Sequence, residues 1–212
     1  MLTSSVTNAS SIDEIYKEAE SLKKLKNKNI IELYHAFAEQ KVFCMIMECA
    51  PDGELLAYVE ERTRLDEHTA RIIFKQICSA ISYCHSRGIV HRDLKMENVL
   101  FKDKEHLHIK VVDFGIAGVC KANKQDKVEA GSLAYMPPEV LAESNADTTT
   151  AIDVWAIGCI FYGMIYGKLP FWGDTEDEFA RAILKQKPLF DVSIPFSKEG
   201  KTLLTRMLDK DP

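Results

Sequence analysis

Residues 91–100 read HRDLKMENVL and bring three chemically useful side chains into one short stretch. Asp93 offers a carboxylate, Lys95 an ammonium group two residues later, and Asn98 an amide five residues later. A second carboxylate, Asp113, follows the apolar pair VV. Phosphoryl transfer to an alcohol needs a carboxylate that orients the hydroxyl and accepts its proton, a cation near the moving group, and oxygen ligands for Mg²⁺. The four residues supply these groups.

The elements that must position these groups can be read from the apolar spacing. Ser11 begins a capping box with Glu14, and helical spacing continues to about residues 27–29. The strand-like stretches 30–37 and 41–48 are separated by AEQ, which predicts a hairpin. The turn PDG at 51–53 then leads to a short helix from Glu54.

A long helix is predicted between Asp66, a good N-cap residue, and Gly88, a good residue beyond a helix end. The loop at 91–98 runs into the strand VLF, and Leu107, Ile109 and Val111 alternate in a second strand before Asp113. Further helices are expected near 138–143, 150–166, 176–186 and 197–208. The chain is therefore expected to fold as an α+β protein, with a small first part and a larger helical part.

Composition excludes several classes of protein. The 212 residues are 46% hydrophobic and carry a net charge of −5, which favours a packed domain and gives no reason to expect nucleic acid or an anionic membrane as partner. The uncharged run 154–167 is shorter than the roughly 20 residues that span a bilayer and predicts a buried central helix. Six cysteines without a C-x-x-C pair indicate reduced thiols, and hence the cytoplasm or the nucleus.

The motifs H-R-D-L-x-x-x-N, D-F-G and P-P-E, a variant of A-P-E, occur in this order at 91–98, 113–115 and 137–139. From about residue 12 to its end the chain resembles a eukaryotic protein kinase. The stretches MECAPDGELLAYV, LDEHTAR and YCHSRGIVHRDLKMENVLF are most similar to the calcium/calmodulin-dependent and AMP-activated branch. The resemblance implies a two-lobe kinase fold, with residues 12–48 in a partial small lobe, residues 49–212 in the large lobe, and residues 1–11 as a disordered segment.

The resemblance also implies catalytic roles. Asp93 is expected to act as catalytic base, and Lys95 to contact the γ-phosphate of ATP. Asn98 and Asp113 are expected to bind Mg²⁺. Lys95 also points to Ser/Thr rather than Tyr substrates, and Asp153 is expected to anchor the catalytic loop from the buried helix.

Other residues are assigned to the nucleotide site by the same resemblance. Glu18 matches the Glu that pairs with a phosphate-holding Lys, although a solvated charge on the helix surface is the alternative. Met47 is expected to be the gatekeeper, and the hinge, residues 48–50, is expected to face adenine through Glu48 and Ala50. Leu100 is also assigned to the nucleotide site. A regulatory spine is expected from Leu22, Leu33, His91 and Phe114.

Substrate recognition is expected from Ser132 beside Asp93 and from Glu54, which matches a position that meets an Arg three residues before the target. Glu54 is also assigned to the nucleotide site, and Glu97 is expected to add to Arg recognition. The position of an activating Thr holds Val128, and no Ser, Thr or Tyr lies between Asp113 and Ser132. We therefore expect Glu129 to replace a phosphate in part by pairing with Arg92.

The sequence departs from the family pattern at both ends. The first Gly is Gly53 and the first Lys is Lys17, so the 212 residues contain neither a Gly-rich loop nor a strand Lys before Glu18. They stop at LDKDP, before the Arg that pairs with Glu139 in relatives. We expect a chain truncated at both ends that binds Mg-ATP poorly and transfers little phosphate by itself.

The predicted function is ATP-dependent phosphorylation of Ser/Thr hydroxyls on protein substrates, with Mg²⁺ as cofactor and protein partners that regulate it. The alternative is a pseudokinase-like module that binds substrates or regulators without catalysis.

Overall fold

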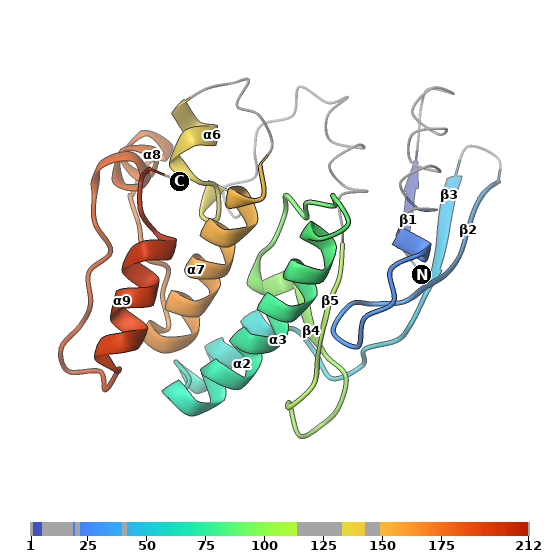
Figure 1. The fold of residues 1–212 in the computed structure, drawn as a ribbon, viewed down its shortest axis with the longest axis horizontal. Helices are drawn as coiled ribbons and strands as arrows, with labels where there is room; N and C mark the ends of the chain where they lie inside the picture. Colours follow the sequence, from blue (N-terminus) through green and yellow to red (C-terminus); the bar gives the residue numbers. More distant parts are fainter. Residues whose placement is uncertain are drawn as a thin grey trace.

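The computed structural model describes residues 2–5, 19, 22–39, 42–113, 133–142 and 149–211. A three-stranded antiparallel sheet of order β1-β3-β2 forms the small part, from β1 (Leu2–Ser5), β2 (Leu33–Glu39) and β3 (Val42–Met47). In Figure 1 this sheet lies at the opposite side of the molecule from α8 and α9. The predicted hairpin is confirmed, with Leu33 opposite Met47 and a register shift between Leu33 and His35.

The prediction of disorder for residues 1–11 is wrong for Leu2–Ser5, which pairs with β3. A run of Ser and Thr has no apolar alternation and therefore contains no local sign of a strand, whose partner lies about 40 residues away. The predicted helix ending near residues 27–29 lies mostly outside the described residues. Ala19, Leu22 and Lys23 are helical, and Ala19 and Leu22 pack with Leu33 in a small separate core.

The helical part begins with α2 (Leu55–Arg62) and α3 (Glu67–His85). Asp66 caps α3 as predicted, because its carboxylate accepts a hydrogen bond from the Thr69 backbone N–H at 3.0 Å. The apolar stripe of α3 is buried at Ala70, Ile73, Ile77, Ile81 and Cys84. Beyond the helix end, Gly88 takes the left-handed φ of 72° that glycine adopts at no steric cost.

The central helix α7 (Ala151–Tyr166) is buried along nearly its whole length, as the uncharged run predicted. It packs against α3 and against α9 (Lys198–Met207). Gly158 allows the close approach of α9, since a Cβ there would lie 3.0 Å from Leu208 Cδ2. The remaining helices are α6 (Pro138–Ala142) and α8 (Glu176–Lys185), both within a residue or so of prediction. Within the described ranges, no helix is long and apolar enough to cross a membrane.

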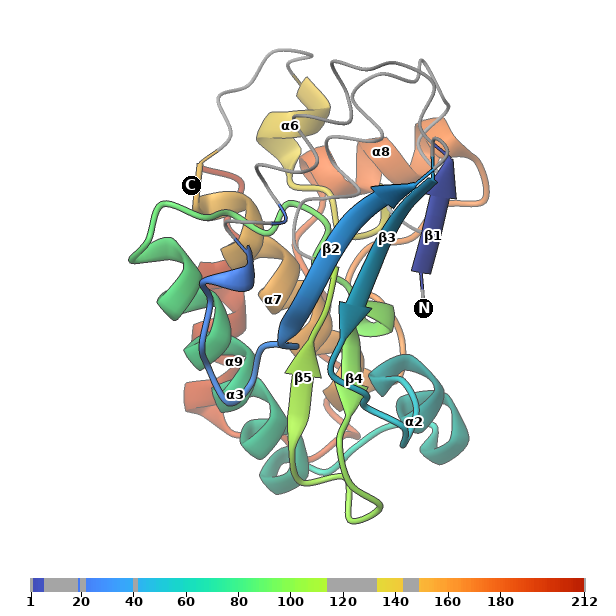
Figure 2. The same ribbon diagram turned by 90° about the vertical axis from the view of Figure 1, so that its right-hand side faces the viewer.

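A second, two-stranded sheet joins the two parts. The short turn η1 (Met96–Asn98) leads into β4 (Val99–Phe101), which pairs with β5 (Ile109–Val111). Figure 2 shows the start of β2 and the end of β3 next to β5 and β4. The backbone makes this contact through a parallel bridge between Ile30 and Val111.

The alternation expected for residues 107–111 differs from the observed strand. Leu107 is exposed and precedes β5, whereas all three residues of β5 are buried, including Lys110. Both faces of β5 are therefore covered, and a strand covered on both faces does not alternate between core and solvent.

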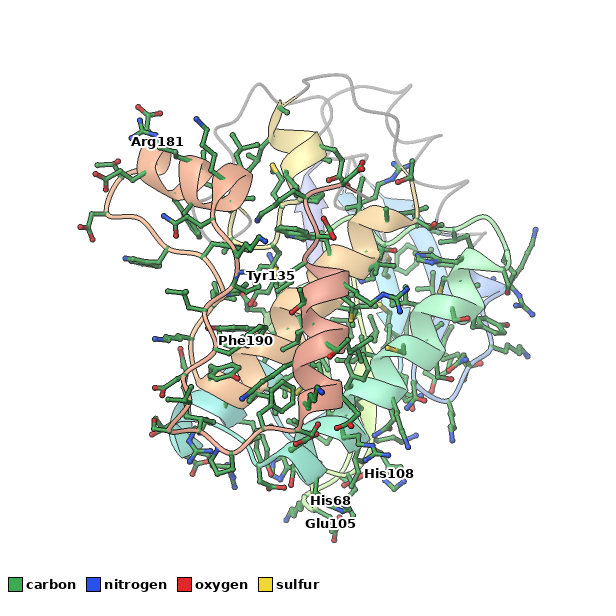
Figure 3. All side chains as sticks on the ribbon, turned by 60° about the vertical axis from the view of Figure 1, so that its left-hand side comes forward. His68, Glu105, His108, Tyr135, Arg181 and Phe190 are labelled. Carbon is green, nitrogen blue, oxygen red and sulfur yellow. The ribbon has the colours of Figure 1, made fainter. Side chains whose placement is uncertain are left out.

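Figure 3 shows the side chains of the described residues, with His68, Glu105 and His108 at one end of the molecule. Tyr135 is buried, and Phe190 is half-buried. Phe190 lies 6.2 Å from Tyr162 and 6.1 Å from Tyr166, measured between ring centroids. The cysteines among the described residues are free thiols, at positions 44, 49, 78, 84 and 159.

Candidate active site

The catalytic loop, residues 91–98, is held by hydrogen bonds from its backbone to a fully buried carboxylate. Asp153 in α7 is 0% exposed, and its Oδ1 accepts a hydrogen bond from the Arg92 backbone N–H at 2.9 Å. Its Oδ2 accepts from the His91 backbone N–H at 2.8 Å. His85, the last residue of α3, places Nε2 at 2.7 Å from the same oxygen. Asp153 is therefore bonded to two backbone amides of the loop and to the His85 ring.

His91 sits inside the loop as a neutral ring. Its Nδ1 accepts from the Asp93 backbone N–H at 3.3 Å, so Nε2 carries the proton and donates to the Val112 carbonyl at 2.9 Å. Complete burial lowers the pKa of His91, while the nearby Asp153 carboxylate acts in the opposite direction. His91 therefore links the catalytic loop to the segment that carries Asp113.

Two non-glycine residues at the site have left-handed backbone angles. Arg92 has φ of 71° and Asp113 has φ of 60°. Such angles are uncommon for residues with a Cβ and are held only where the surroundings fix them. At Arg92 the bond to Asp153 supplies that restraint. The backbone is therefore held in an uncommon conformation both immediately before Asp93 and at Asp113 itself.

The structure brings together three of the predicted catalytic side chains. Lys95 Nζ lies 3.5 Å from Asp93 Oδ2, with the two side chains 17% and 23% exposed. Asn98 is buried and its Nδ2 donates to the Asp93 backbone carbonyl at 2.7 Å and approaches Asp93 Oδ2 at 3.5 Å. A carboxylate and an ammonium group therefore stand side by side at a partly open surface.

A cation could be held by Asn98 and Asp113. Because Nδ2 of Asn98 donates to Asp93, the amide oxygen is the atom left to face a cation, and Val112 N donates to the Asn98 backbone carbonyl at 3.0 Å. This bond holds Asn98 beside Val112, the residue before Asp113. An amide oxygen and a carboxylate are ligands that Mg²⁺ prefers. The donor set therefore fits the ion.

The hinge lies at the end of β3. Met47 packs with Leu33 in the small core, and Ala50 is half-buried. Leu100 in β4 is half-buried as well, and it pairs by a backbone bridge with Glu54 at the start of α2. The Glu48 side chain points elsewhere, because its carboxylate contacts Lys102 and Lys110. If Glu48 contacts adenine as predicted, it must do so through its backbone N–H or carbonyl.

Glu97 contacts a residue that the sequence did not single out. Burial, and next the adjacent Glu97 carboxylate, raise the pKa of Tyr135. Within the described part of the chain, Glu97 Oε2 is buried and has no hydrogen-bond partner. Glu97 is half-buried in η1, which packs against α2, the helix that begins after Glu54. Two acidic residues assigned to substrate recognition thus come from adjacent elements.

Four residues singled out from the sequence lie outside the described residues: Glu18, Phe114, Glu129 and Ser132. Glu139 is half-buried in the first turn of α6, and Arg92 is exposed. The sequence reasoning missed His85 and Lys110. A histidine at a helix end and a lysine in a strand have no local signal, because their partners lie 68 residues away in Asp153 and 62 residues away in Glu48.

The protein kinase domain family matches residues 2–212. The chain is 36% identical over 211 residues to calcium/calmodulin-dependent serine/threonine-protein kinase 1 of Oryza sativa subsp. japonica, across 97% of this chain and 35% of that protein. It is 37% identical over 204 residues to CBL-interacting serine/threonine-protein kinase 17 of Arabidopsis thaliana, across 94% of this chain and 46% of that protein.

A crystal structure of Rad53 1–466 in complex with AMP-PNP is similar, with a TM-score of 0.78 and 30% identity over 94% of this chain and 50% of that one. The chain belongs to the protein kinase family. The predicted α+β kinase fold and the resemblance to the calcium/calmodulin-dependent branch are confirmed. The chain spans less than half the length of the two curated relatives described above.

Proposed function

We propose that this protein transfers the γ-phosphoryl group of ATP to Ser or Thr hydroxyls of protein substrates. The observation that carries the proposal is the catalytic loop, in which Asp93, Lys95 and Asn98 are held together above the buried Asp153. A loop that only binds a partner has no need for a carboxylate, an ammonium group and an amide fixed within hydrogen-bonding reach of one another.

Each side chain has a distinct part in the proposed reaction. Asp93 orients the substrate hydroxyl and accepts its proton. Lys95, whose Nζ lies 3.5 Å from Asp93 Oδ2, supplies a positive charge to the phosphoryl group during transfer. Asn98 and Asp113 would hold Mg²⁺, which neutralises phosphate charge when bound. The buried anchor at Asp153 keeps these groups in place before substrate arrives.

The proposal includes a preference for Arg near the phosphorylated residue. Glu54 is exposed at the start of α2, and Glu97 lies half-buried in the adjacent η1 and adds a second negative charge to this region. A guanidinium group pairs well with such carboxylates because it donates in a planar fork. We also propose regulatory protein partners, since one relative is named a CBL-interacting kinase.

The test is phosphate transfer to a peptide that contains Ser and an Arg three residues before it. Asp93→Asn keeps the side-chain volume and should reduce transfer by about 10²–10⁴-fold, the range for loss of a general base. Asp177→Asn, an exposed change in the first turn of α8, is the matched control and should leave the rate unchanged.

Three outcomes would count against the proposal. Equal transfer by the Asp93→Asn protein would show that the carboxylate is not the base. Equal transfer to a Tyr peptide would contradict the Ser/Thr assignment. Peptide binding without any transfer, in a protein that also binds no Mg-ATP, would favour the binding module instead.

A further inference from the structure

The carboxylate of Glu48 in the hinge is clamped by two lysines of different exposure. Lys102 Nζ lies 2.7 Å from Oε1, and Lys110 Nζ lies 2.6 Å from Oε2. The Lys102 side chain is 51% exposed, whereas those of Lys110 and Glu48 are 7% and 13% exposed. Burial acts to raise the pKa of Glu48, and the bonds from both lysines outweigh it, so the pKa lies below its usual value. Glu48 is therefore ionised at neutral pH.

Lys110 connects the hinge to the strand that leads to Asp113. It lies in the middle of β5, three residues before Asp113, and its Nζ also donates to the Ile30 carbonyl at 3.2 Å. The segment around Ile30 enters β2 and is bonded to β5, with Ile31 N donating to Val111 O at 3.0 Å. Lys110 thus sits where β5 and the entry to the small sheet meet.

The same segment is bonded back to the hinge. Glu48 N donates to the Glu32 carbonyl at 2.8 Å, and Glu32 N approaches Glu48 Oε2 at 3.4 Å. A buried lysine is costly unless it is paired, and an apolar pair of similar volume is often as stable. A charged pair at this position is therefore better explained by the geometry that it fixes than by the stability that it adds.

We infer that the Glu48–Lys110 pair is a tether that sets the position of the hinge backbone relative to Asp113, and that Lys110 is thereby a positioning residue for the nucleotide. The nucleotide part of this inference rests on the proposed function. Adenine would meet the hinge and the metal-bound phosphates would meet Asp113, so one ligand spans both ends of the tether. Such a ligand binds most tightly when the separation of its two contact points is set in advance.

The test compares a ligand that spans both points with one that reaches the hinge alone. Calorimetry with Mg-ATP and with adenosine gives the two affinities for the wild-type chain and for Lys110→Met. We expect Lys110→Met to weaken Mg-ATP about tenfold, the effect of one hydrogen bond to a charged group, and adenosine by less than about threefold. Lys110→Arg retains a cation and should restore most of the Mg-ATP affinity.

Lys102→Met is the matched control, because it removes the other lysine from the same carboxylate. An exposed ion pair contributes little, so both affinities should change by less than about twofold. The inference would be overturned if Lys102→Met and Lys110→Met weakened Mg-ATP binding equally, or if Lys110→Met reduced the affinities for Mg-ATP and adenosine equally.

If Lys110→Met does not fold, Glu48→Gln tests the same pair with an unchanged side-chain size. An unchanged ratio of the Mg-ATP and adenosine affinities in Glu48→Gln would then overturn the inference.

Hydrogen–deuterium exchange of the ligand-free chain tests the tether without any nucleotide. The Glu48 amide is bonded to the Glu32 carbonyl at the hinge, and the Ile31 amide to the Val111 carbonyl of β5. Both amides should exchange faster in Lys110→Met and at the wild-type rate in Lys102→Met. Unchanged exchange in Lys110→Met would overturn the tether. A wild-type chain that binds neither Mg-ATP nor adenosine would instead refute the proposed function, and the exchange rates would still decide the tether.

Discussion

Replacing Asp153 by Asn should loosen the catalytic loop without changing the shape of its anchor. The carboxylate accepts from Arg92 N at 2.9 Å through one oxygen, and from His91 N at 2.8 Å and His85 Nε2 at 2.7 Å through the other. In Asp153→Asn one oxygen becomes an NH₂ group. The amide keeps most bonds when its oxygen faces His91 and His85, which turns the NH₂ group toward the Arg92 N–H and removes that bond.

The magnitude follows from these three bonds. A hydrogen bond to a charged group contributes about 1.5–3 kcal/mol, and the two bonds that remain become neutral ones of roughly half that strength. Removing a buried charge offsets part of this loss, because desolvation of a carboxylate costs several kcal/mol. We expect a decrease of about 2–4 kcal/mol in the free energy of unfolding, compared with a typical total of about 5–15 kcal/mol.

Urea unfolding of the wild-type and Asp153→Asn chains measures this difference, and amide exchange at His91 and Arg92 locates it. The Asp177→Asn chain, altered at an exposed position of α8, serves as control. A loss below about 0.5 kcal/mol, the usual range for surface substitutions, would refute the reasoning. So would a large loss in which His91 and Arg92 exchange as slowly as in the wild type.

Two further predictions concern the packing around α7. Lys210 lies 3.7 Å from the centre of the Phe171 ring, and burial lowers its pKa to about 8 from 10.5. Between about pH 8 and 10.5 the unfolded chain therefore binds more protons at Lys210 than the folded chain does. The stability of the wild type relative to Lys210→Met, measured by thermal unfolding, should rise with pH across this window. A difference in stability that does not change with pH would contradict the prediction. Gly158→Ala should destabilise by about 1 kcal/mol in urea, because its Cβ would lie 3.1 Å from Met207 Cβ, which the α9 backbone holds in place, and this overpacking outweighs the helix propensity that Ala adds. An unchanged midpoint would contradict this.

The sequence predicted the parts of the molecule whose cause is local. The capping of α3 by Asp66 and the hairpin of β2 and β3 follow from neighbouring residues, and the structure has both. Within the catalytic loop, the bond from Asn98 Nδ2 to the Asp93 carbonyl is also local, because the two residues are five positions apart. These features need no knowledge of distant partners.

The features that escaped prediction depend on contacts between distant segments. β1 has a polar sequence and forms only because β3 offers an edge to it. The alternating pattern predicts that Lys110 faces solvent. In the structure Lys110 is buried, because its Nζ contacts the Glu48 carboxylate and the Ile30 carbonyl. Asp153 was assigned from resemblance, while its third donor, His85, depends on where α3 ends relative to α7.

The anchoring of the catalytic loop has a consequence for the order in which the chain can fold. The bonds that hold His91 and Arg92 come from α7, from α3 through the shared carboxylate of Asp153, and from Val112. α3, α7 and β5, the strand that precedes Val112, all contribute side chains to the large continuous core. The reaction centre can therefore acquire its shape as soon as α3, α7 and β5 pack together, before β1, β2 and β3 have associated into a sheet.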